Sequence, residues 1–152
     1  MSDFYVYLQV PEYLAQWIEH TFGSPVNIDM SSPENRVLNE FLIKTPAGHK
    51  PDTGEGANVT IPIPYFKGKD PRTYNHITRK GKAALAESFR TLLERNIWAE
   101  INPLEETANC KLSTLIYAWM EKHGIDEKHW DTLSQIYYRR RKSLFKKNGI
   151  KT

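Results

Sequence analysis

The feature that most constrains the fold is a pair of helical patterns near the end of the sequence. Apolar residues first recur at the spacing of an amphipathic helix, at Leu112, Leu115, Ile116, Trp119 and Met120. A second stripe with helical spacing follows at Trp130, Leu133, Tyr137 and Leu144. Between them, Gly124 suits the left-handed position just past a helix end, and Asp126 can cap the next helix. We therefore expect helices near 112–122 and 126–147, joined by a tight turn.

An earlier helix completes a C-terminal unit of three helices. Its apolar stripe, which predicts a helix near 78–100, consists of Leu85, Phe89, Leu92 and Leu93. Proline has no amide hydrogen and its ring clashes with the preceding helical turn, so we expect this helix to end before Pro103.

Two segments of the N-terminal part predict strands. Residues 3–10 and 59–65 each place their apolar side chains at every second position, which is typical of strands. Pro62 and Pro64 remove two amide donors from the same side of the later strand. We therefore expect it at the edge of a small sheet, paired with the first strand.

Two short helices and a long loop are expected between these strands. The first helix begins after Pro11 and ends at Gly23. The second is capped by the serines before Pro33 and ends before Pro46. Residues 45–58 contain almost no side chains that pack, so they predict an exposed loop.

The composition is that of one folded domain, or of two small ones that share a core. Of the 152 residues, 39% are hydrophobic and 12% aromatic, which is enough for a buried core and argues against disorder. We expect an α+β fold, mostly helical, with a small two- or three-stranded N-terminal sheet and the C-terminal three-helix unit. An α+β subdomain is placed at 1–66 and a basic helical subdomain at 67–152.

Cysteine content and hydropathy restrict the compartment. The single Cys110 excludes an internal disulfide framework and fits a reducing environment. No segment approaches the roughly 20 apolar residues of a membrane span, and the first residues do not resemble a secretory signal. We expect a cytoplasmic protein without a membrane partner.

The charges are distributed unevenly along the chain. Residues 1–110 carry 11 Lys and Arg against 14 Asp and Glu, whereas residues 111–152 carry 10 against 4. From Arg139 to Lys151 there are seven basic residues and no acidic one. A concentrated positive field attracts polyanions, so this asymmetry points to the last helix as a candidate binding surface.

The last helix supplies the candidate nucleic-acid contacts. Gln135, Arg139, Lys142 and Lys146 recur at helical spacing and form one polar stripe, beside a second stripe that contains Tyr138. Like charges at this spacing repel one another, and phosphates would supply the counter-charge. We expect phosphate contacts from Arg139, Arg140, Arg141, Lys142, Lys146 and Lys147. Gln135 and Tyr138 are the candidates for base or sugar contact. The alternative is a solvated basic helix end that complements its own dipole.

A second basic run precedes the first helix of the C-terminal unit. It contains one acidic residue, Asp70, among the basic residues Lys67, Lys69, Arg72, Arg79, Lys80 and Lys82. We interpret it as a secondary basic patch that would add phosphate contacts and salt dependence. An ordinary solvated loop and helix start is the alternative.

Two resemblances favour a DNA-binding protein. Residues 112–135 resemble the bacterial helix-turn-helix pattern, with Gly124 at the turn and Trp130 and Leu133 at the inward positions of the second helix. Residues 136–147, IYYRRRKSLFKK, are similar to the end of a homeodomain recognition helix, with two aromatics, paired basic residues and a closing lysine pair. The family's adenine-reading asparagine falls on Arg140, so that base contact is not implied.

The whole chain also resembles small proteins carried on bacterial mobile elements, and no function follows from that likeness. In the helix-turn-helix register, the residues that face a groove would be Glu127, Lys128, Asp131, Thr132 and Gln135. The basic last helix and the helix-turn-helix and homeodomain resemblances lead us to expect a bacterial DNA-binding accessory or regulatory protein.

Enzyme chemistry is not predicted. The five histidines lack metal-ligand spacing, and the glycines follow no phosphate-binding fingerprint, so neither a metal nor a cofactor is expected. The alternative is a nuclease or phosphoryl-transfer activity at the polar cluster 70–76.

Two binding functions besides duplex DNA binding are compatible with the sequence. The first is a protein-interaction adaptor that docks through the Tyr5 and Tyr7 face, or that binds an acidic surface through its basic end. The second is a binder of single-stranded RNA or DNA, in which exposed tyrosines stack on bases.

Overall fold

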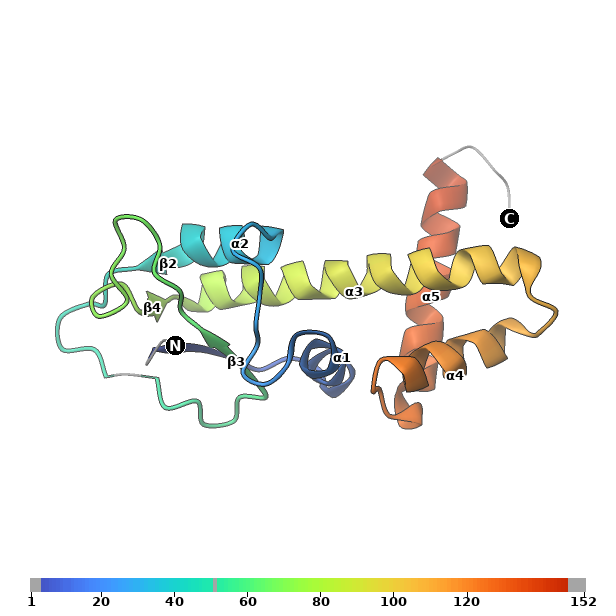
Figure 1. Ribbon diagram of the computed structural model, residues 1–152, viewed down its shortest axis with the longest axis horizontal. Coiled ribbons are helices and arrows are strands. Elements are labelled where there is room, and N and C mark those ends of the chain that lie inside the picture. The colour runs from blue at the N-terminus through green and yellow to red at the C-terminus, as the bar shows by residue number, and fades with distance from the viewer. Residues whose placement is uncertain (1–3, 51, 148–152) are drawn as a thin grey trace. The chain divides into compact units, whose positions relative to one another are not determined.

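The computed structural model describes residues 4–50 and 52–147, the last of these without its side chain. The chain divides into two compact units, Met1–Arg90 and Thr91–Thr152. The elements, in chain order, are β1 (Tyr5–Leu8), α1 (Glu12–Phe22), α2 (Pro33–Phe41), β2 (Leu42–Ile43), β3 (Val59–Pro62), β4 (His76–Ile77), α3 (Arg79–Thr107), α4 (Leu112–Lys122), the short 3-10 helix η1 (Glu127–His129) and α5 (Trp130–Lys147) (Figure 1). The prediction of a mostly helical α+β fold is confirmed.

The first unit contains the predicted strand pair. β1 and β3 are antiparallel, with Val6 opposite Ile61. The Ile63 amide donates to the Phe4 carbonyl at 2.9 Å, so the pairing extends past the end of β3. Pro62 alternates with Ile61 and Ile63 and therefore faces the other edge, as its missing amide hydrogen requires.

A second small sheet was not predicted from the sequence. α2 ends at Phe41, before Pro46 as expected, and the chain becomes extended at Leu42, with φ −75° and ψ 123°. Leu42 then pairs with Ile77 of β4 in an antiparallel sheet. Only two residues of each strand take part, so neither segment is long enough to show an alternating pattern.

The first turns of α3 belong to the first unit. Phe89 of α3 is fully buried and meets Phe22 edge-on, with 5.8 Å between ring centroids. Ser88 donates to the buried Glu34 of α2 at 3.4 Å. Because these turns pack on α1 and α2, the division falls after Arg90, later than the subdomain boundary expected after residue 66.

The segment 45–58 has no helix or strand in its described residues, and most of these residues are exposed, as predicted. It is nevertheless attached to the unit. The Asn58 side chain accepts from the Val10 amide at 3.0 Å and donates to the Val10 carbonyl at 2.7 Å. Gly54 lies so close to Tyr7 that a Cβ there would be 2.7 Å from its Cδ1 atom. The loop therefore covers part of the Tyr7 face of β1.

The second unit consists of the end of α3 together with α4, η1 and α5. Its core includes the fully buried Ile97, Ile116, Leu133 and Tyr137. The prediction that α3 ends before Pro103 is wrong, because the helix continues to Thr107. Pro103 and Ala99, whose carbonyl loses its hydrogen bond, are both exposed, so water can solvate that carbonyl.

The turn between α4 and α5 has the predicted chemistry. Gly124 has a left-handed φ of 70°, and the Ile125 amide donates to the Met120 carbonyl at 2.9 Å. These contacts terminate α4 as a glycine C-cap does. The Asp126 side chain accepts from the Lys128 amide at 3.0 Å and caps η1, which leads directly into α5. Within the described part of the chain, no helix combines the length and apolar character of a membrane crossing.

Candidate nucleic-acid interface

One face of α5 is buried and the opposite face is exposed. Leu133, Ile136 and Tyr137 lie in the core of the second unit. The exposed row, as we call the candidate contacts that face outward, consists of Gln135, Tyr138, Arg139, Lys142 and Lys146. An α-helix advances about 100° per residue, so these positions fall within an arc of about 100°. The structure therefore brings these five side chains onto a single surface.

Tyr137 fixes the orientation of this face. Its ring is stacked on Trp98 of α3, with 5.2 Å between centroids and 30° between planes. Its hydroxyl donates to Oε2 of Glu105 at 2.6 Å. Burial, followed by the hydrogen bond to Glu105, raises the pKa of Tyr137 well above its ordinary value. The phenol is therefore a neutral donor that holds α5 against α3.

The remaining predicted phosphate contacts differ from the exposed row. Arg141 forms an ion pair with Oε1 of Glu105 at 2.9 Å and lies 5.6 Å from the Phe145 ring centroid. Arg140 is half-buried, and no acceptor among the described residues reaches its buried Nε. The side chain of Lys147 lies outside the described residues. Among the predicted contacts whose side chains the structure describes, Arg139, Lys142 and Lys146 are thus the exposed cations.

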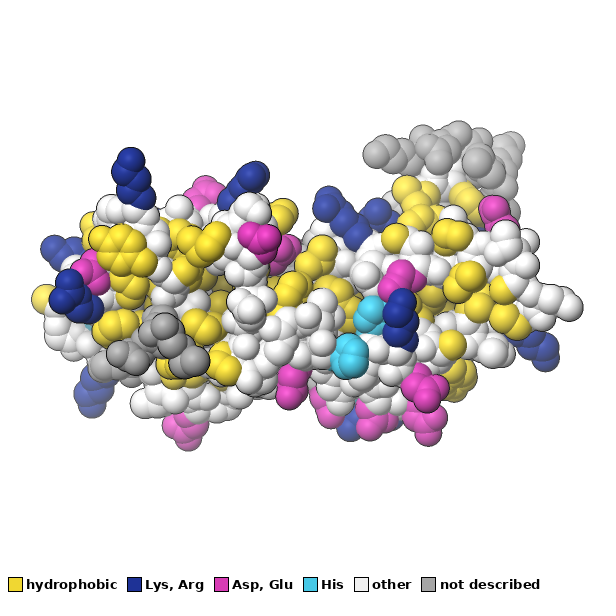
Figure 2. All heavy atoms as spheres, in the orientation of Figure 1, with side chains coloured by type: hydrophobic (Ala, Val, Ile, Leu, Met, Phe, Trp, Pro, Cys, Tyr) yellow, Lys and Arg dark blue, Asp and Glu magenta, His cyan; other side chains and the backbone are white. Residues whose placement is uncertain are grey.

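The opposite end of α5 is acidic. Figure 2 shows acidic side chains gathered around the turn between α4 and α5. The exposed acidic residues there are Glu121, Asp126, Glu127 and Asp131. The second unit therefore carries negative charge where α5 begins and positive charge where it ends.

The second basic run lies in the first unit, where half of its members are engaged. Lys69 donates to the carbonyls of Asn39 and Leu42, the latter at 3.0 Å, and so caps the C-terminal end of α2. Arg72 pairs with Asp70 at 2.6 Å and lowers the pKa of that carboxyl. Lys82 pairs with Asp52 at 2.5 Å. The other three members, Lys67, Arg79 and Lys80, are exposed.

A polar cluster between α3 and α4 was missed by the sequence analysis. Glu100 lies 3.1 Å from Nε2 of His123 and 3.1 Å from Nζ of Lys122. Burial disfavours the Glu100 carboxylate, but the hydrogen bonds from His123 and Lys122 outweigh it and lower the pKa. The indole of Trp119 donates to Asn96 at 3.2 Å. These partners are more than 20 residues apart, so no local pattern predicts them, and we assign the cluster to joining the helices.

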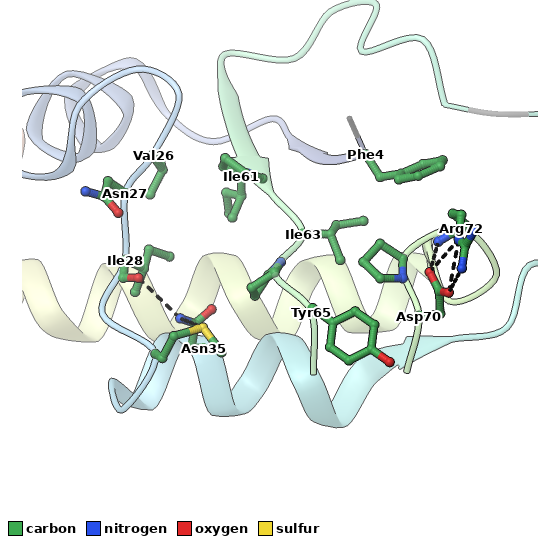
Figure 3. A pocket seen from close by; sticks show the side chains of 14 residues that line it. Phe4, Val26, Asn27, Ile28, Asn35, Ile61, Ile63, Tyr65, Asp70 and Arg72 are labelled. Carbon is green, nitrogen blue, oxygen red and sulfur yellow. Dashed lines mark hydrogen bonds and ion pairs between the residues drawn. The ribbon is translucent and has the colours of Figure 1, made fainter. Parts of the chain in front are cut away.

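The first unit contains a hollow of about 600 Å³ beside the proline-bearing edge of β3 (Figure 3). Its wall is mainly apolar, with Phe4, Ile63 and Tyr65 among its residues. Several polar groups at its margin are engaged: Arg72 pairs with Asp70, and Asn35 donates to the Asp29 carbonyl at 2.8 Å.

The polar cluster at 70–76 is used to shape its own loop. Asn75 donates to the Pro71 carbonyl at 2.9 Å, and the Thr45 hydroxyl donates to the Asn75 side chain. His76 lies against His49, with ring centroids 4.3 Å apart, and burial together with His49 lowers the pKa of His76. No group of three potential metal ligands converges in the part of the chain that the structure describes.

Comparison of the chain with protein-family models, with curated proteins and with solved structures finds no match. The resemblance of the α4–α5 pair to helix-turn-helix and homeodomain modules therefore stays a prediction. Of the surfaces that the two units present, the exposed row combines several cations with groups suited to bases.

Proposed function

We propose that the second unit binds duplex DNA through the exposed row of α5. The observation that carries this proposal is the exposure of Arg139, Lys142 and Lys146 on one face, with Gln135 and Tyr138 between and beside them. No carboxylate lies within ion-pair distance of these three cations among the residues described. Such a row repels itself at helical spacing, and phosphates relieve the repulsion.

The geometry gives the proposal a measurable salt dependence. Three phosphate contacts on a duplex predict a slope of log affinity against log salt of about −2.7, and of about −2.1 on a single strand. Between 50 and 200 mM salt, affinity for a duplex should fall about 40-fold, and for a single strand about 20-fold. Base contacts from Gln135, which can pair with adenine, would add a contribution that salt does not remove.

Fluorescence anisotropy with the full chain tests the proposal. The probes are a labelled duplex, the corresponding single strand and an RNA strand, each titrated across the same salt series. Tight binding to duplex with a slope near the expected value supports the proposal. Failure to bind any of the three probes at low salt contradicts it.

A matched pair of variants assigns the surface. R139A/K142A/K146A should lose most of the salt slope, because each phosphate contact contributes about one unit of slope. R36A/K44A/K50A removes the same charge from exposed positions of the first unit and should bind like wild type. Equal losses in both variants would show that net charge, and not the exposed row, controls binding.

The exposure of Tyr138 favours a second candidate function, the binding of single-stranded nucleic acid. Its side chain is 50% exposed beside the cations of the row, and an exposed aromatic ring can stack on an unpaired base. In that case Y138A should weaken single-strand binding by about 1–3 kcal/mol, whereas Y138F should retain it. If duplex binding dominates and Y138A changes it little, the stacking role is excluded.

A further inference from the structure

The exposed row continues past its basic part to an acidic residue. Asp131 is exposed and precedes Gln135 by four residues, so it lies on the same face as Gln135, Lys142 and Lys146. With a rise of 1.5 Å per residue, Asp131 and Lys146 are about 22 Å apart along the helix. A single surface of α5 therefore changes from negative to positive along its length.

The residues that lead into α5 strengthen this gradient. Asp126 and Glu127 are exposed in and before η1, and Glu121 is exposed at the end of α4. Helix-turn-helix proteins read base edges with the first residues of the second helix, which enters the groove between two rows of phosphates. Here that position holds the exposed carboxylates of Glu127 and Asp131 with one exposed cation, Lys128, between them. The net charge is negative, so it repels phosphates.

We infer that Glu127 and Asp131 restrict the nucleic-acid footprint to the last three turns of α5 by repelling phosphates from its start. This inference rests on the proposed function and specifies which part of α5 contacts the nucleic acid. Contact runs from Gln135 to Lys146, about 16 Å of helix. The module then holds the backbone and has Gln135 and Tyr138 as its base-contacting side chains, and the start of the helix contacts no bases.

The same carboxylates also have a structural role. Acidic residues at the start of a helix interact favourably with its dipole, and the Asp126 side chain caps η1. Asp126 is therefore left unchanged in the test. Thermal unfolding of each variant without nucleic acid measures the dipole contribution to stability separately. That contribution does not alter the salt slope of binding.

The test is E127K/D131K in the full chain, titrated with the same labelled duplex. Two added phosphate contacts should steepen the slope from about −2.7 to about −4.5, so that affinity falls about 500-fold between 50 and 200 mM salt. At 50 mM the variant should bind at least about tenfold more tightly than wild type. E19K/E40K makes the same charge change at exposed positions of the first unit and serves as the control.

Two results would overturn the inference. A slope and affinity equal to those of E19K/E40K would mean that the start of α5 does not face the duplex. Weaker binding by E127K/D131K would mean that the carboxylates themselves contact base amino groups, as Asp and Glu do with cytosine. If the wild-type chain binds duplex, either result contradicts this inference and leaves the proposed function intact. If the wild-type chain binds no probe, both the proposed function and this inference are contradicted.

Discussion

The two basic runs of this protein look alike in sequence and differ in structure. The run at 67–82 lies in turns and at the start of α3, where carboxylates and helix-terminal carbonyls are close by. The run in α5 projects from a helix whose other side is buried. Half of the cations in the run at 67–82 bind groups of the protein itself, whereas the run in α5 presents Arg139, Lys142 and Lys146 outward.

This difference teaches that charge density alone does not identify a binding surface. A lysine within reach of a free carbonyl becomes a cap, as Lys69 does for α2. An arginine two residues after an aspartate closes a local ion pair, as Arg72 does with Asp70. On α5 the exposed positions recur with the helical repeat, so their cations face outward together. The run at 67–82 also keeps three exposed cations, but they lie in a turn and at the first two positions of α3, and not along one face of a helix.

The largest expected effect tests this contrast directly. R139A/K142A/K146A should weaken duplex binding at 50 mM salt more than about tenfold, because about three phosphate contacts are lost. K67A/R79A/K80A removes the exposed cations of the second basic run and should weaken binding less than about threefold. Anisotropy titrations of both variants under one buffer make the comparison. A reversed order of the two losses would place the interface in the first unit.

The fold was predictable where local chemistry determines it. The strand pair β1–β3, the capped start of α2 and the Gly124 turn follow from alternation, capping and left-handed geometry, and all are confirmed. The end of α3 was not, because the cost of Pro103 depends on whether the freed carbonyl reaches water. That is a property of the packed helix and not of the local sequence.

A second effect concerns the stability of the first unit. K69M should lower the free energy of unfolding by about 1.5 kcal/mol, because the carbonyls at the end of α2 lose a charged donor. This corresponds to a fall in melting temperature of about 3–6 °C. Exposed Lys67 gives the matched control K67M, which should melt within about 1 °C of wild type. Equal melting temperatures for K69M and wild type would show that the cap contributes nothing.

The candidate site was predictable as a helix face but not residue by residue. Helical spacing identified the stripe of Gln135, Arg139, Lys142 and Lys146, and these residues are exposed. The engagement of Arg141 was not foreseen, since its partner Glu105 lies beyond Pro103, where the sequence predicted no helix. Because the predicted end of α3 was too early, the ion pair between Glu105 of α3 and Arg141 of α5 was not predicted.

A smaller effect separates the neighbouring arginines of α5. R141M should destabilise the protein by about 0.5–1 kcal/mol, because its ion pair with Glu105 is partly exposed and screened by solvent. R139M should leave stability unchanged and should reduce the salt slope of duplex binding by about one unit. Denaturant unfolding and anisotropy on the same preparations measure both quantities. If R141M instead reduced the slope as strongly as R139M, Arg141 would be a phosphate contact that leaves Glu105 on binding.

The smallest effect is the acid sensitivity of the Lys82–Asp52 pair in the second basic run. A hydrogen bond from Lys82, followed by one from the Gly54 amide, lowers the pKa of Asp52 below its ordinary value of 3.8. A carboxyl with a lowered pKa in the folded state stabilises the protein above its unfolded pKa, and that stabilisation is lost as pH falls through the folded pKa. The coupling between D52N and K82M in a double-mutant cycle should therefore be present at pH 7 and constant down to about pH 5. It should then decline below about pH 4.

Denaturant unfolding of wild type, both single variants and the double variant gives this coupling at each pH. Because the pair is partly exposed, water and salt screen it, and the coupling should stay below about 1 kcal/mol even at pH 7. A coupling that persists undiminished at a pH low enough to protonate Asp52 in the folded protein would show that the two side chains interact through packing and not through charge. In that case Lys82 would be held in place by packing, and an ion pair would not explain why it is engaged while Lys67, Arg79 and Lys80 are exposed.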